Sequence, residues 1–106
     1  MVKASHIVAA LRRFREQGNI TQKQMSEKTG ISFSTIKRIE RGTRKMTLDD
    51  YEAYLDTLDI SHVDVLIAVE TGNYEVDREI ASLARKLPEE LREAHLVYLL
   101  ALTKAL

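Results

Sequence analysis

The sequence contains no cysteine and no tryptophan, and it has a single proline. Without cysteine, the chain can form neither a disulfide bond nor a thiolate metal site, and a reducing cytoplasm is the expected location. No apolar run reaches the roughly 20 residues that a membrane-spanning helix requires. No signal peptide is expected at the start, because the first residues lead directly into an amphipathic pattern. We therefore expect no association with a membrane.

The chain also lacks the motifs of common catalytic sites. It has no glycine-rich phosphate loop and no nucleophile elbow. The three histidines, His6, His62 and His95, fall on three different predicted helices and form no His-x-x-x-His pair. We therefore expect no enzymatic activity, no metal site and no cofactor.

Charge is distributed unevenly along the 106 residues, although the net charge is zero. Residues 1–46 hold 11 lysines and arginines against 3 aspartates and glutamates, a net charge of +8. Residues 47–106 hold 5 against 13, a net charge of −8. A basic half of this kind favours a polyanionic partner, although pairing of the basic half with the acidic half is an alternative.

The stretch TQKQMSEKTGISFSTIKRIERG, from Thr21 to Gly42, predicts two short helices joined by a turn. Thr21 and Gln24 have the spacing of a capping box at the start of the first helix. Gly30 suits a turn in which the backbone needs positive φ. Ser32 is the expected cap of the second helix.

The second of these helices has two different faces. Ile36 and Ile39 form an apolar stripe on one side. At about 100° per residue, the opposite face carries Ser34, Lys37, Arg38 and Arg41, with Phe33 on its flank. A helix held by an apolar back and exposed at a polar front is the kind of element that a DNA major groove accepts.

Apolar spacing predicts helices on both sides of this stretch. A first helix is expected to begin with Ser5 as its N-terminal cap and to end at Gly18 and Asn19. A fourth begins at Thr47 with Asp50 as its capping-box partner. Its expected apolar stripe is Leu48, Tyr51, Leu55 and Leu58.

Further helices are expected over residues 61–70, over residues 74–86, and from Pro88 to the end of the chain. The predicted fold class is therefore all-α. A five-helix domain would occupy residues 1–72, and a pair of C-terminal helices would occupy residues 73–106.

Residues Leu11–Ile60 resemble the Cro/repressor-type (XRE) helix-turn-helix that is common in phage and bacterial regulators. The resemblance rests on a glutamine after a threonine cap, a small residue four positions further, a glycine in the turn, and an Ile-x-x-Ile-Glu-x-Gly ending. It extends roughly over residues 5–70. It implies a repressor-like domain that binds double-stranded DNA, in a cytoplasmic and nucleoid-associated protein.

The resemblance also implies roles for individual residues. The positions that match base-edge contacts are Phe33, Ser34, Lys37 and Arg38. The positions that match phosphate contacts are Gln22, Lys23, Arg41, Thr43, Arg44 and Lys45. The resemblance further implies a structural ion pair between Arg15 and Glu40. Three alternatives stay open. Phe33 either lies on a thymine methyl or packs against the preceding helix, and Lys37 reaches either a base edge or a phosphate. Any single lysine or arginine can also be a solvated surface charge.

The last predicted helix, PEELREAHLVYLLALTKAL, is apolar well beyond a single stripe and needs to be covered. We expect it to form a dimer interface through Leu91, His95, Tyr98, Leu99, Leu102 and Leu106. The alternative is that it folds back on its own domain, and both arrangements can hold together.

Together these features predict a sequence-specific DNA-binding transcriptional regulator, most simply a repressor, that binds a pseudo-palindromic operator as a homodimer. One alternative is the antitoxin of a toxin–antitoxin pair, which would bind both DNA and a toxin. Another is a protein-interaction module without DNA binding. A protein partner, either a toxin or an antirepressor, is compatible with the acidic and apolar C-terminal part.

Overall fold

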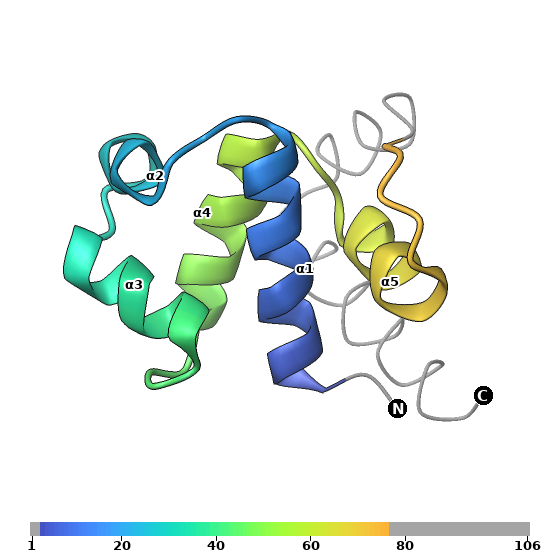
Figure 1. Ribbon diagram of the computed structural model, residues 1–106, viewed down its shortest axis with the longest axis horizontal. Helices are drawn as coiled ribbons and strands as arrows, with labels where there is room; N and C mark the ends of the chain where they lie inside the picture. The colour runs from blue at the N-terminus through green and yellow to red at the C-terminus, as the bar shows by residue number, and fades with distance from the viewer. Residues whose placement is uncertain (1–2, 77–106) are drawn as a thin grey trace.

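The computed structural model describes residues 3–76, which form a bundle of five α-helices. They are α1 (Ala4–Gln17), α2 (Gln22–Thr29), α3 (Phe33–Arg41), α4 (Leu48–Leu58) and α5 (His62–Thr71). Figure 1 shows α2 and α3 on one side of α1 and α4, with α5 on the other side. This part of the chain contains no β-strand, and the predicted all-α class is confirmed. None of the five described helices has both the length and the apolar character that a membrane crossing requires.

Local hydrogen bonds fix where the helices begin. At the start of α2, the Thr21 hydroxyl accepts from the Gln24 backbone N–H at 3.0 Å, and the Gln24 side chain accepts from the Thr21 N–H at 2.9 Å. Thr47 forms the same reciprocal pair at the start of α4. These capping boxes satisfy backbone N–H groups that have no partner within the helix. The caps predicted at both positions are confirmed.

The core draws at least one completely buried side chain from every helix. Leu11, Met25, Ile36, Tyr54 and Val65 come from α1 to α5 in turn, and each is 0% exposed. Each helix is therefore held to the others by its own apolar face, which is the main source of stability in short helices.

Two predicted features of the helices are wrong. Ser5 does not cap α1, because α1 begins at Ala4, Lys3 occupies the cap position, and no side chain bonds to the cap. Ser5 thus lies inside the first turn, where its hydroxyl cannot act as a cap. In α4, Leu48 is 48% exposed, because the first residue of the helix points away from the core.

The prediction of a helix that begins at Tyr74 is also wrong, because residues 72–76 lie outside any helix. The ring of Tyr74 instead packs against Phe14 of α1, with 4.8 Å between ring centroids, and Arg13 stacks over it at 4.4 Å. The remainder of that predicted helix and the whole of the last predicted helix lie outside the described residues. The proposed dimer residues lie there too: Leu91, His95, Tyr98, Leu99, Leu102 and Leu106.

Candidate nucleic-acid interface

The turn between α2 and α3 is fixed by polar contacts of small side chains. Gly30 ends α2 in the left-handed region, at φ 78°. The Ser26 hydroxyl donates to the Ile31 carbonyl at 2.6 Å, and the Thr29 hydroxyl donates to the Met25 carbonyl at 2.7 Å. Because no Cβ strains the positive φ of glycine, α3 can leave the turn at a defined angle to α2.

The back of α3 is anchored in the core. Ile36 and Ile39 are both 0% exposed, as their spacing predicts. Ser32 begins the helix by accepting from the Thr35 N–H at 3.2 Å, and Gly42 ends it at φ 84°. The position of α3 is therefore set by its buried back, and its length is set by the serine cap and the terminal glycine.

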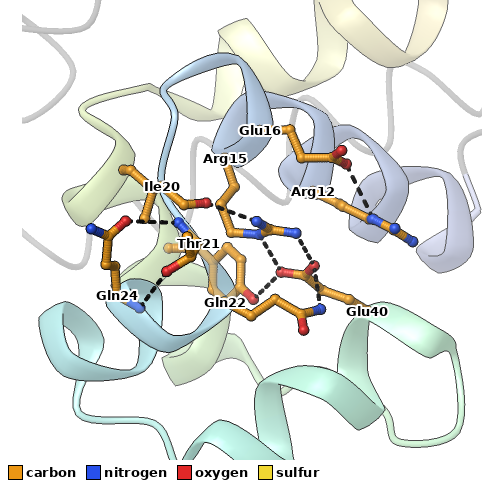
Figure 2. A network of polar contacts seen from close by, with 9 residues as sticks. Arg12, Arg15, Glu16, Ile20, Thr21, Gln22, Gln24 and Glu40 are labelled. Carbon is orange, nitrogen blue, oxygen red and sulfur yellow. Dashed lines mark hydrogen bonds and ion pairs between the residues drawn. The ribbon is translucent and has the colours of Figure 1, made fainter.

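A buried ion pair connects α3 to α1 (Figure 2). Arg15 donates from Nε to Glu40 Oε2 at 3.0 Å and from Nη2 to Glu40 Oε1 at 2.8 Å. The two side chains are only 8% and 2% exposed. The third nitrogen of Arg15, Nη1, donates to the Ile20 carbonyl at 2.7 Å. A bidentate pair of this kind fixes both distance and orientation.

The Glu40 carboxylate has two further partners. The Gln22 side-chain amide of α2 donates to Oε1 at 3.1 Å, and the Tyr54 hydroxyl of α4 donates to Oε2 at 2.7 Å. One carboxylate on α3 therefore joins α1, α2 and α4. We call Arg15, Gln22, Glu40 and Tyr54 the Glu40 network.

Sequence reasoning missed Tyr54. The apolar stripe predicted for α4 does not include it, and the partner of its hydroxyl lies 14 residues away in the chain. The available signal was a tyrosine one helical turn after Tyr51, on a helix that had to bury one face.

The network changes the pKa values of its acidic members. Burial alone raises the pKa of the Glu40 carboxyl, but the hydrogen bonds from Arg15, Tyr54 and Gln22 and the charge of Arg15 outweigh burial. The pKa of Glu40 therefore lies below its ordinary value of 4.5. Burial, reinforced by Glu40, raises the pKa of the Tyr54 hydroxyl, which therefore remains a donor.

Glu40 is expected to make the fold sensitive to acid. Its pKa is lower in the folded than in the unfolded chain, so the stabilisation it gives is present above the unfolded-state pKa. That stabilisation is lost as the pH falls through the folded-state pKa. Urea denaturation followed by circular dichroism, between about pH 6 and about pH 3, compares the parent with Glu40→Gln. The stability gap between them should shrink on acidification, whereas a gap that stays constant with pH would contradict this role.

The front of α3 is exposed and basic. Ser34, Lys37 and Arg38 are exposed, and Phe33 is 38% exposed. The Lys37 ammonium lies 4.5 Å from the centre of the Phe33 ring. Arg38 Nε donates to the Ser34 carbonyl at 3.4 Å, a long bond within the helix. The four residues that match base-edge contacts thus share one solvent-facing surface.

The residues that match phosphate contacts lie at the start of α2, at the end of α3 and in the loop that follows α3. Lys23, Arg41, Arg44 and Lys45 are exposed. Thr43 is exposed too, but its backbone N–H and its hydroxyl both donate to the Arg38 carbonyl, at 3.0 and 3.2 Å, and so close the end of α3. Gln22 is half-buried, and its side-chain amide nitrogen donates a hydrogen bond to Glu40.

The region around α3 is positively charged because it contains very few acidic residues. Residues 28–46 contain six lysines and arginines and a single acid, Glu40. Because Arg15 neutralises Glu40 inside the protein, the acid does not offset the positive charge outside. A surface of this kind attracts a polyanion. Within residues 3–76, no group of three or more His, Asp or Glu side chains is arranged to hold a metal ion.

The model of the helix-turn-helix family matches residues 11–65, just over half of the chain. The matched region runs from the middle of α1 into α5 and contains the whole α2–turn–α3 unit. Comparisons with curated proteins and with solved structures give no significant match. Given the family match, the capped α2, the glycine turn and the anchored α3, this chain belongs to the Cro/XRE-type helix-turn-helix family of DNA-binding transcriptional regulators.

Proposed function

We propose that the protein is a sequence-specific regulator, most simply a repressor, that occupies a pseudo-palindromic operator in double-stranded DNA as a homodimer. The observation that supports this proposal is the exposed basic front of α3 on a helix whose back is completely buried. A helix presented in this way can enter the major groove with its side chains toward the base edges.

Arg38 is the strongest candidate for reading a base. A guanidinium can donate two parallel hydrogen bonds to guanine O6 and N7, which is the commonest specific contact in the major groove. The long bond from Arg38 Nε to the Ser34 carbonyl is weak and is readily exchanged for such a contact. Ser34 can donate or accept, and it therefore discriminates little between bases.

The surrounding cations would supply attraction that does not depend on sequence. Lys23, Arg41, Arg44 and Lys45 are exposed around α3, where they can neutralise phosphates and release counterions. Gln22 and Thr43 would act mainly by stabilising the protein itself. Gln22 donates a hydrogen bond to Glu40, and Thr43 donates one to the last turn of α3. Base contacts would then specify the site, and phosphate contacts would position the protein on it.

The homodimer follows from the small size of one such unit. A single module buries little DNA surface, and tight specific binding usually needs two. Two copies of α3 about 34 Å apart would read half-sites about one helical turn apart. Selection of bound sites from random duplex DNA tests this, because a dimer selects an inverted repeat and a monomer selects one half-site.

Substitutions of Arg38 and Lys45 are expected to have different effects on DNA binding. Arg38→Ala should relax the preference at one base position per half-site and weaken binding there by about 1–3 kcal/mol. Lys45→Ala should weaken binding to all duplexes equally and reduce the salt slope by about 1 per protomer. Fluorescence anisotropy with the selected duplex and its single-base variants, across a salt series, measures both effects.

Arg13→Ala is the matched control, because it removes one positive charge from α1, where Arg13 stacks on Tyr74. It should leave affinity and salt slope close to those of the parent. If Arg38→Ala and Lys45→Ala bound every duplex as the parent does, the proposed contacts would be wrong.

A further inference from the structure

Phe33 is an apolar ring on an otherwise polar surface. It is the first residue of α3, it is 38% exposed, and it lies outside the core cluster of the described residues. Burial in the core therefore does not account for a phenylalanine at this position. The first residues of a recognition helix are the ones that come nearest to the base edges.

Lys37 is held over this ring. It follows Phe33 by one helical turn, and its ammonium lies 4.5 Å from the ring centre, within the range of a cation–π interaction. The contact keeps the lysine side chain along the front of α3 and limits its rotamers. The ring and the ammonium thus form one unit, which we call the Phe33–Lys37 pair.

We propose that the Phe33–Lys37 pair reads a thymine beside a guanine, with the ring on the thymine C5-methyl and the ammonium on the guanine. This inference rests on the proposed DNA-binding function and specifies what one part of its surface recognises. It makes Phe33 a specificity-determining residue rather than a packing residue.

The chemistry of the major groove fits the two halves of the pair. Thymine alone among the four bases offers a methyl group there, and an aromatic ring can cover it. Guanine offers the acceptors N7 and O6, to which an ammonium can donate. Because Phe33 already restrains Lys37, less side-chain freedom is lost when the ammonium binds. The exposed part of the ring remains available to the methyl group.

Base analogues that delete one group at a time test the proposal. Deoxyuridine in place of thymidine removes only the methyl, and 7-deazaguanine in place of guanine removes only N7. Each thymine and each guanine of a half-site obtained by selection with the parent protein is replaced in turn. Dissociation constants are then measured by anisotropy for the parent, Phe33→Ala, Phe33→Leu and Lys37→Met.

One thymine per half-site should stand out. Deoxyuridine at that position should raise the dissociation constant of the parent protein by about fourfold. This is the factor that corresponds to returning one methyl group to water. Phe33→Ala should bind both forms equally, and Phe33→Leu should retain most of the difference. Lys37→Met should keep the methyl preference but lose sensitivity to 7-deazaguanine at the adjacent guanine. The guanine read by Arg38 is the internal control, because it should stay sensitive in all variants.

The outcomes separate this inference from the proposed function. If the parent selects sites but no thymine shows a methyl effect that depends on Phe33, the pair does not read a thymine and the inference is overturned. If the parent selects no duplex at all, the proposed function itself fails. Because Phe33 is exposed, Phe33→Ala should remain folded, which circular dichroism verifies before binding is measured.

Discussion

Glu40→Ala should lower the free energy of unfolding by about 3–5 kcal/mol, the usual effect of breaking a buried ion pair from one side. The substitution leaves the Arg15 guanidinium, which is 8% exposed, without its carboxylate. It also removes the acceptor of Tyr54 and of Gln22, so polar groups of α1, α2 and α4 lose a partner together. Chemical denaturation followed by circular dichroism measures the change.

The other arginine–glutamate pair of α1 provides a matched control. Arg12 and Glu16 form an ion pair at 3.1 Å, but their side chains are 53% and 57% exposed. Solvent weakens such a pair, so Arg12→Ala should change stability by less than about 1 kcal/mol. Equal effects of Glu40→Ala and Arg12→Ala would mean that burial of the Glu40 network does not contribute to stability.

Ile36→Ala should destabilise the protein by about 2–5 kcal/mol. Ile36 is 0% exposed and lies on the buried back of α3, so the substitution removes packed methyl groups and leaves a cavity. The loss should appear in thermal or chemical denaturation. At temperatures where the variant is folded, its preference among bases should match that of the parent, because no front residue has changed.

Lys37 is the matched control for Ile36, because it is the next residue along the same helix and is exposed. Lys37→Ala should change stability by less than about 1 kcal/mol, because it is a surface substitution that removes one exposed cation–π contact. A loss in Lys37→Ala as large as in Ile36→Ala would show that the two faces of α3 do not have separate roles.

Several features that depend on neighbouring residues were predictable from the sequence, although the cap predicted at Ser5 is wrong. The capping boxes at Thr21 and Thr47 and the turn at Gly30 are confirmed, because each is fixed by side chains and φ angles within three or four residues. The buried stripe of α3 is likewise a local pattern, and Ile36 and Ile39 lie where it places them.

Features that depend on distant residues were not predictable in the same way. The contact between Arg15 and Glu40 was implied by the family resemblance, since no local pattern relates residues 25 positions apart. Tyr54 was missed because periodicity places a ring on a face but does not say which carboxylate its hydroxyl meets. The ring of Tyr74, expected in a helix, instead packs against Phe14, a contact between α1 and the last residues of the described region.

The direction in which a long exposed side chain points also cannot be predicted from a sequence pattern. Helical spacing places Phe33 and Lys37 one turn apart, which makes a contact feasible but does not require it. The structure adds that the ammonium lies over the ring, whereas Arg38 turns back to its own helix. This difference is why Lys37 is paired with Phe33, whereas Arg38 is assigned a guanine of its own.

Selection from a random pool of DNA duplexes, run in parallel with the parent and with Arg38→Ala, most directly tests the claim that the front of α3 reads bases. The parent should enrich an inverted repeat with a fixed base at the Arg38 position. Arg38→Ala should enrich the same repeat with that one position degenerate in each half-site. Identical motifs from both proteins, or no enrichment by the parent, would contradict the account.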